Sequence, residues 1–224
     1  MHEILSNPIW SALTTSHAQF AQTCGPLRRF AADVAPFCAV EQAGGDLGEV
    51  TGMQPGEAVF FLGAAPALPP GWSIENAFQV LQMVYDAGRP VPASHDADAS
   101  ALGNDDLPAM LALTALAYPE FFRPGTPLLG RYIGVKTPSG LAAMAGQRLA
   151  CTGYREISAV VTHPAHRGQG HAARLIEQLT RMILAEARTP YLHVSATNKQ
   201  AWALYEGLGF VPTRELRTIK IRIA

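Results

Sequence analysis

The sequence is poor in charge, and neither sign dominates. Only 16% of the 224 residues are charged, and 17 basic against 18 acidic side chains leave a net charge of −1 at pH 7. Proteins that bind nucleic acid or acidic membranes mainly through charge need a basic surplus, so we expect neither partner. Hydrophobic residues make up 48%, which is enough to bury a core and excludes disorder over most of the chain.

Long apolar runs and paired cysteines are also absent. The longest nearly uncharged run, residues 107–118, falls short of the roughly 18 apolar residues that a membrane-spanning helix needs. The first residues lack the basic and then apolar pattern of a secretory signal. Cys24, Cys38 and Cys151 are far apart and odd in number, so they predict no disulfide framework and no metal knuckle. Free thiols suit a reducing compartment, and we expect a cytoplasmic protein.

One polar segment divides the chain into two regions. Residues 89–106 contain two prolines and have no periodicity, which is typical of a connector. Before them, the apolar runs 58–62 and 77–85 favour strands. We therefore predict an N-terminal αβ region over residues 1–100 and a second domain over residues 101–224.

The second region has a dense and regular pattern. Its longest expected helix carries apolar residues at the helical period and ends at a proline. The expected elements are helices at 108–117, 170–188 and 198–207, and strands at 131–136, 141–150, 156–162, 191–195 and 218–223.

Two glycines separate the strand that ends at Thr162 from the following helix. Gly168 and Gly170 leave backbone N–H groups uncovered, and the helix directs the positive end of its dipole to the same place. Arg167 adds a fixed charge beside them. The segment therefore predicts an anion site that is best suited to phosphate.

Nucleotide-binding motifs are the first alternative for this loop. The pattern Gly168-x-Gly170-x-x-Ala173 formally fits the dinucleotide fingerprint. Too few residues follow Gly170 to build a second half-domain, and the next strand ends at Ser195 with no acidic residue for a ribose. A P-loop is excluded because the Gly-Lys-Ser/Thr sequence is missing.

A second pattern extends over more of the chain. Arg167-x-x-Gly170-x-Ala172 resembles the Arg/Gln-x-x-Gly-x-Gly/Ala motif of the GNAT superfamily of N-acetyltransferases. Asn198-x6-Tyr205-Glu-x-Leu-Gly-Phe follows in the family's order, and the resemblance spans about residues 105–224. It implies an α+β fold with a central mixed, mostly antiparallel sheet flanked by helices. For the N-terminal region we expect a degenerate half-copy of the same fold.

The resemblance also implies acetyl-CoA as cosubstrate. In the family, the loop holds the pyrophosphate through backbone N–H groups, and the strand before it binds the pantetheine arm. That strand carries a bulge and separates from its neighbour, so that the thioester can enter and a backbone N–H can polarise its carbonyl. Asn198 would contact the cofactor or cap its helix. The residues so assigned are Val160, Val161, Thr162, Arg167, Gly168, Gln169, Gly170, His171, Ala172 and Asn198.

The catalytic groups follow from the same resemblance. Tyr205 would be the general acid that protonates the leaving thiolate, two helical turns or about 10 Å beyond Asn198. Glu156 is the preferred base, on the same strand face as Ser158. His193, five residues before Asn198 where some members place a glutamate, is the second candidate. A water chain without a dedicated base is the third.

The implied reaction is acetyl transfer to a primary amine by direct attack in a ternary complex. The motif contains no cysteine for a covalent acyl-enzyme. A non-catalytic acyl-CoA-binding regulatory module is the alternative. The acceptor could be a small molecule or a peptide N-terminus, and residues 118–124 are a candidate wall of its site. Both a monomer and a homodimer fit the sequence.

Histidines in the loop region raise the question of a metal. His163, His166 and His171 lie within nine positions. Pro164 breaks any helical spacing between them, and no cysteine or carboxylate is near in sequence. We therefore predict no metal site.

Overall fold

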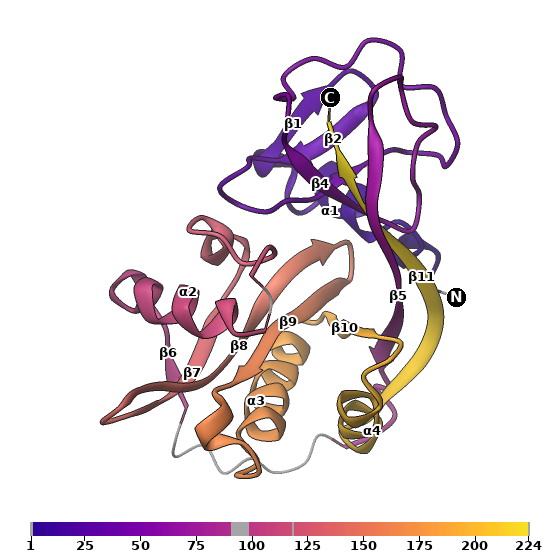
Figure 1. Cartoon of the computed structure of the whole chain (residues 1–224). Helices are drawn as coiled ribbons and strands as arrows, with labels where there is room; N and C mark the ends of the chain where they lie inside the picture. Colours follow the sequence, from indigo (N-terminus) through magenta and orange to yellow (C-terminus); the bar gives the residue numbers. More distant parts are fainter. Residues whose placement is uncertain (1, 91–98, 118, 224) are drawn as a thin grey trace.

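The computed structural model describes residues 2–90, 99–117 and 119–223. It contains a three-stranded sheet and an eight-stranded sheet with the strand order β4-β11-β5-β10-β9-β8-β7-β6 (Figure 1). In the large sheet all neighbours pair antiparallel except β9 and β10, which are parallel. The strands are β1 Ala21–Cys24, β2 Leu27–Phe30, β3 Cys38–Ala39, β4 Ala58–Leu62, β5 Ser73–Tyr85, β6 Ser100–Ala101, β7 Tyr132–Thr137, β8 Gly140–Cys151, β9 Tyr154–Thr162, β10 Thr189–Ser195 and β11 Phe210–Arg222.

Helices flank the large sheet. α3 packs against β8, β9 and β10, and α1 packs against β8. In α3 one face is apolar at the helical period, so Leu175, Ile176, Leu179 and Ile183 are fully buried. The α-helices are α1 Pro8–Thr14, α2 Leu107–Ala115, α3 His171–Ala185 and α4 Lys199–Gly207. The expected α+β fold is confirmed, and none of the described helices is long and apolar enough to cross a membrane.

Residues on both sides of position 100 build the large sheet. β5, which contains the strand expected at 77–85, pairs with β11 along its length, and β4, the strand expected at 58–62, pairs with residues 218–222 of β11. Figure 1 shows β5 and β11 running side by side from α4 to the small sheet. The two long strands therefore connect the N-terminal region to the rest of the molecule. The division at residue 100 and the origin of the N-terminal region as a half-copy stay predictions.

β11 is much longer than the strand expected at 218–223. It begins at Phe210, and its pairing with β5 is shifted between Pro212 and Arg214. Proline cannot donate to a ladder and is tolerated at such irregularities. The polar residues around it break the alternation that marks the strand's second half, so the sequence pattern revealed only that half.

His17, which follows α1, is a buried histidine. The His17 ring packs edge-on against Phe20 and Phe30, with ring centroids 5.7 and 6.0 Å away. Burial and, to a smaller extent, the nearby Arg155 charge lower the pKa of His17 to about 4. In the unfolded chain the pKa returns to about 6.5. Protonation therefore favours the unfolded state.

Exchanging this histidine for glutamine should remove part of the pH dependence of stability. The contribution of neutral His17 to the free energy of unfolding is complete above about pH 6.5. As the pH falls toward 4, the free energy of unfolding drops by about 3 kcal/mol because of this group. Between pH 7 and pH 4, the free energy of unfolding should therefore fall by about 3 kcal/mol more in the wild type than in His17→Gln. Urea unfolding at several pH values measures it, with His166→Gln, a half-exposed loop histidine, as control. Parallel curves for wild type and His17→Gln would contradict the assignment.

Candidate active site

Two adjoining cavities share a wall between β9 and β10. The first, of about 510 Å³, is the glycine cleft, and the second, of about 300 Å³, is the aromatic cavity. Their common wall consists of Val160, His193, Ser195 and Tyr205. The glycine cleft is further lined by Thr162, His166, Arg167, Gly168, Gln169, Gly170, His171, Ala172, Ala173, Val194, Asn198, Gln200, Ala201 and Leu204. The aromatic cavity is further lined by Phe37, Leu62, Phe78, Val80, Phe121, Phe122, Thr126, Tyr132, Arg148, Ile157, Ser158, Ala159 and Thr218.

The gap that joins these cavities comes from two parting strands. β9 and β10 pair in parallel as far as Ile157 and Leu192, and beyond this point each strand continues without the other. On its other side β9 has a register shift against β8, and Ala159 within it has a φ of 51°. A residue in this left-handed conformation at a register shift marks a β-bulge. The bulge and the separation that the resemblance implied are both present.

The loop before α3 has the backbone that its glycines permit. Gly168 and Gly170 have φ values of 77° and 75°, a conformation that other residues adopt only with strain. Gly170 is the N-cap of α3, so the free N–H groups of the helix's first turn lie at the cleft. All six loop residues predicted to hold a phosphate, 167–172, line the glycine cleft.

The other residues assigned to the cofactor differ in position. Val160 and Thr162 line the glycine cleft, whereas Val161 is buried in a core cluster with Tyr132 and Met144. Side chains alternate along a strand, so Val161 can face the cleft only with its backbone. Asn198 is the N-cap of α4, where its Oδ1 accepts a hydrogen bond of 3.1 Å from the Ala201 N–H. Capping is thus one role of Asn198, and contact with a cofactor stays a prediction.

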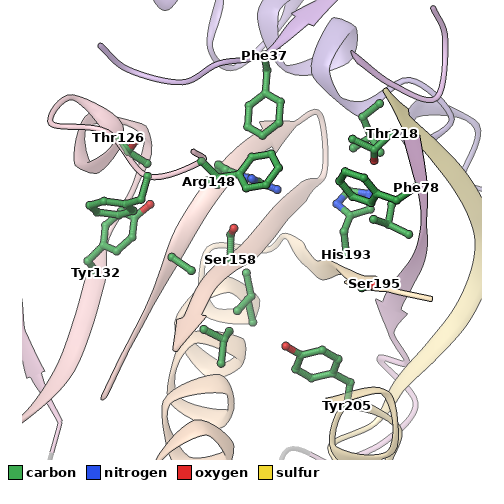
Figure 2. Close-up of a pocket in the computed structure, with 17 residues that line it drawn as sticks. Phe37, Phe78, Thr126, Tyr132, Arg148, Ser158, His193, Ser195, Tyr205 and Thr218 are labelled. Atoms are coloured by element: carbon green, nitrogen blue, oxygen red, sulfur yellow. The ribbon is translucent and has the colours of Figure 1, made fainter. Parts of the chain in front are cut away.

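Tyr205 stands at the junction of the two cavities. The residue is 7% exposed, and the centroid of its ring lies 6.4 Å from that of the Phe210 ring. Figure 2 shows its hydroxyl directed away from α4 and into the space beside β9. The expected acid is therefore in a position where both a thioester in the cleft and an acceptor in the cavity could reach it.

Glu156 is held in a closed network of hydrogen bonds. Its carboxylate accepts bonds of 2.8 and 2.7 Å from Nε and Nη2 of Arg148, 2.8 Å from Nδ1 of His193 and 3.2 Å from the Leu149 N–H. Burial alone would raise the pKa of Glu156. The Arg148 charge and the hydrogen bonds from Arg148 and His193 outweigh burial and hold this pKa far below its usual value. The carboxylate lines neither cavity, in contrast to His193.

Both ring nitrogens of His193 take part in hydrogen bonds. Its Nδ1 is bonded to Glu156, and its Nε2 lies 3.0 Å from Nε2 of Gln82. The same Gln82 nitrogen also donates a hydrogen bond of 2.9 Å to the Leu5 carbonyl oxygen. An amide nitrogen only donates, so His193 Nε2 must accept and its ring proton sits on Nδ1. If the Gln82 amide were flipped, its oxygen would face the Leu5 carbonyl oxygen, and two hydrogen-bond acceptors would oppose each other. The hydrogen bonds therefore assign both the orientation of the Gln82 amide and the tautomer of His193.

Sequence reasoning missed Arg148 and Gln82. Gln82 is fully buried in β5, and a polar residue within the apolar run 80–85 was the available signal for it. Nothing in the sequence indicated that Arg148 belongs to the site, because arginines on strands are usually exposed. Of the expected acceptor wall 118–124, Phe121 and Phe122 line the aromatic cavity, and Tyr118 lies outside the described residues.

The loop histidines do not gather into a ligand set. His163 Nδ1 accepts a bond of 3.2 Å from the Ala165 N–H, and its ring centroid lies 5.9 Å from that of His166. His171 is bonded to Gln169 and Arg174. In the described part of the chain, no three His, Cys, Asp or Glu side chains are placed to hold a metal ion.

Solved structures that are similar to this chain include acetyltransferases. The family model of FR47-like proteins matches residues 132–218. A solved structure from Novosphingobium aromaticivorans, described as a GNAT-family acetyltransferase, has 32% identity, covers 99% of both chains and has a TM-score of 0.87. A GCN5-related N-acetyltransferase from Kribbella flavida, at 17% identity and 95% coverage of both chains, shares the fold with a TM-score of 0.57. The search of curated proteins found no match to this chain. The extent and identity of the first match show that this chain belongs to the GNAT family of acetyltransferases.

Proposed function

We propose that the protein transfers the acetyl group of acetyl-CoA to a primary amine by direct attack in a ternary complex. The observation that carries this proposal is the gap between β9 and β10, which joins the glycine cleft to the aromatic cavity. The loop 167–172 would take the pyrophosphate, the pantetheine arm would follow β9, and the thioester would reach the junction at Tyr205. The acceptor would approach from the aromatic cavity.

The chemistry at the junction needs two proton movements. The amine nitrogen forms a bond to the thioester carbonyl carbon, the carbon–sulfur bond breaks, and the sulfur leaves with the electron pair. Backbone N–H groups of the bulged strand would stabilise negative charge on the carbonyl oxygen. Tyr205 would donate its proton to the departing sulfur. The proton of the attacking amine must go elsewhere.

For that second proton we now favour His193 over Glu156. The Glu156 carboxylate has four hydrogen bonds and a strongly lowered pKa, so at neutral pH it is a poor proton acceptor. Its role would be to fix the orientation and tautomer of His193. The one unprotonated nitrogen of His193 is bonded to Gln82, so an amine would displace that bond or reach it through water. A proton path through water alone is the alternative mechanism.

Acetyl-CoA should stabilise the protein, and the glycine loop should be required. At a hundred times its Kd, a ligand adds about 2.7 kcal/mol to the unfolding free energy. For a chain of this size this means a rise in Tm of about 5–10 °C. We expect this rise for wild type with acetyl-CoA and none with NAD. In Gly170→Asp the rise should vanish, because a carboxylate then faces the phosphate site.

A matched glycine separates loss of binding from loss of fold. Gly153, in the turn between β8 and β9, has the same φ of 75° and open space around it. Gly153→Asp should therefore carry similar backbone strain and lower the Tm of the free protein, while keeping the full acetyl-CoA shift. If the wild type shows no shift with acetyl-CoA, the proposed cosubstrate is wrong, and a shift with NAD would return attention to the dinucleotide alternative.

A further inference from the structure

The aromatic cavity has a composition that selects among amines. Its volume of about 300 Å³ is near the lower limit of about 300–1,000 Å³ for small-molecule sites. Phenylalanine, leucine and valine side chains make up much of its wall, and the polar side chains in it are mainly hydroxyls (Figure 2). An apolar group of the size of one aromatic ring fits such a space better than a long polar chain.

The aromatic walls are held by one another. Phe121 stacks on Phe37 with ring centroids 5.9 Å apart and packs at 4.6 Å from Phe60. Phe122 meets Tyr132 edge-on at 5.5 Å. Side chains locked in this way give a cavity of fixed shape, which favours a ligand with an apolar body of matching form.

The charges around the cavity disfavour a second positive group. Among the described residues that line it there is no aspartate or glutamate. Glu156 lies behind Arg148 with both oxygens engaged. The Arg148 guanidinium lies 4.8 Å from the centre of the Phe37 ring, so this ring already has a cation beside it. A second ammonium group in the acceptor would lose its water without gaining a carboxylate.

The Nη1 group of Arg148 is a hydrogen-bond donor beside the cavity for which the described residues supply no acceptor. Nε and Nη2 of Arg148 bind Glu156, and no described residue accepts a hydrogen bond from its Nη1. The side chain is 14% exposed and lines the cavity, and Figure 2 shows its guanidinium reaching in from β8. An N–H donor among aromatic rings gains most from an oxygen acceptor on the ligand.

We propose that the acceptor is a monoamine with an aromatic or branched apolar body and a carbonyl or carboxylate oxygen, and that Arg148 receives this oxygen. The apolar body would lie among Phe37, Phe121 and Phe122, and the amine would point to the junction with the glycine cleft. Polyamines and other acceptors with a second ammonium group are excluded by the same walls. This inference rests on the proposed function.

A panel of four amines tests the inference through release of free CoA thiol. We expect kcat/KM for phenylalaninamide and phenylalanine to exceed that for phenethylamine, which lacks the oxygen, by about tenfold, the value of one additional hydrogen bond to a charged group. Spermidine should be slower than phenethylamine by at least the same factor. Comparison of phenylalaninamide with phenylalanine distinguishes a carbonyl from a carboxylate as the group that Arg148 prefers.

A substitution that adds a carboxylate should shift the preference. Thr218 of β11 lines the cavity, so Thr218→Asp adds an acid to the wall that Arg148 also lines. The ratio of spermidine to phenylalaninamide turnover should rise at least tenfold. Thr152→Asp, in the exposed β8–β9 turn, adds the same charge elsewhere and should leave the ratio unchanged. Because the readout is a ratio, a partial loss of folded protein does not affect it.

Each outcome decides between the two proposals. Equal rates for spermidine and the aromatic amines, or for phenethylamine and phenylalaninamide, would overturn the acceptor inference. So would the absence of turnover with every aromatic amine in a protein that acetyl-CoA stabilises, and this result would leave the cosubstrate assignment intact. The absence of stabilisation by acetyl-CoA would instead overturn the proposed function.

Discussion

Arg148→Met should lower the free energy of unfolding by about 3–5 kcal/mol, the penalty for leaving one member of a buried ion pair without its partner. Arg148 donates two hydrogen bonds to Glu156, whose side chain is 1% exposed. Methionine fills a similar volume but leaves the carboxylate with only His193 and the Leu149 N–H. Urea unfolding at pH 7 measures the loss.

Two comparisons make this prediction specific. The double variant Arg148→Met/Glu156→Leu should regain most of the lost stability, because neither buried charge then remains. Arg131→Met removes a pair with Glu186 that is 3.7 Å long and largely exposed, so it should change stability by less than about 1 kcal/mol. A loss at Arg148 as small as that at Arg131 would contradict the role of the buried pair.

The pH dependence of the same variants carries a second signature. In the folded wild type the pKa of Glu156 is lowered, so its contribution to stability is complete at neutral pH and is lost progressively as the pH falls below the unfolded-state pKa of about 4.3. Without Arg148 this pKa should rise, because burial is no longer outweighed. The carboxyl can then take up a proton in the folded state, and the difference between variant and wild type should shrink as the pH falls.

Tyr205→Phe should lower kcat by about 10- to 100-fold, at or below the lower end of what general acid catalysis contributes. The expected loss is partial because a thiol of pKa about 8.5 is already a fair leaving group. The stabilisation by acetyl-CoA should remain, since phenylalanine keeps the ring packed against Phe210. Steady-state rates and thermal unfolding of the same preparation give both quantities.

The leaving group provides a readout that a structural role would not affect. With an acetyl thioester of a more acidic thiol, the wild type has less need of an acid, so the difference from Tyr205→Phe should narrow. Tyr85→Phe removes a hydroxyl that donates to the Arg89 carbonyl away from both cavities, and it should leave kcat unchanged for either donor. An equal loss with both thioesters would argue that Tyr205 only packs.

The elements with strong local signals could be predicted from the sequence. α3 has a complete apolar face and a glycine N-cap, and β4 is a short apolar run. The two glycines before α3 likewise indicated a phosphate loop without knowledge of the fold. In contrast, α1 and the three-stranded sheet have short, mixed sequences, and their positions depend on packing against distant strands. Periodicity within a short window contains no such information.

The site was predictable where one segment builds it and unpredictable where several do. Residues 160–172 lie in one continuous stretch, and their positions around the cleft follow from the strand–loop–helix order. The network of Arg148, Glu156, His193 and Gln82 joins β8, β9, β10 and β5. Which of these residues meet depends on the register of four strands, so Glu156 and His193 were identified as separate alternatives and not as hydrogen-bonded partners.

The late position of β11 in the chain sets an order for assembly during synthesis. β4 is the edge strand of the large sheet and pairs there only with residues 218–222, which the ribosome adds more than 150 positions later. Until then, the edge of β4 that pairs with β11 has no partner strand, so the nascent chain presents an open strand edge that invites chaperones or misassociation. The glycine loop can form before β11 emerges. The aromatic cavity cannot form before β11 emerges, because Thr218 is part of its wall. The proposed phosphate-binding loop would thus form during synthesis before the proposed acceptor site.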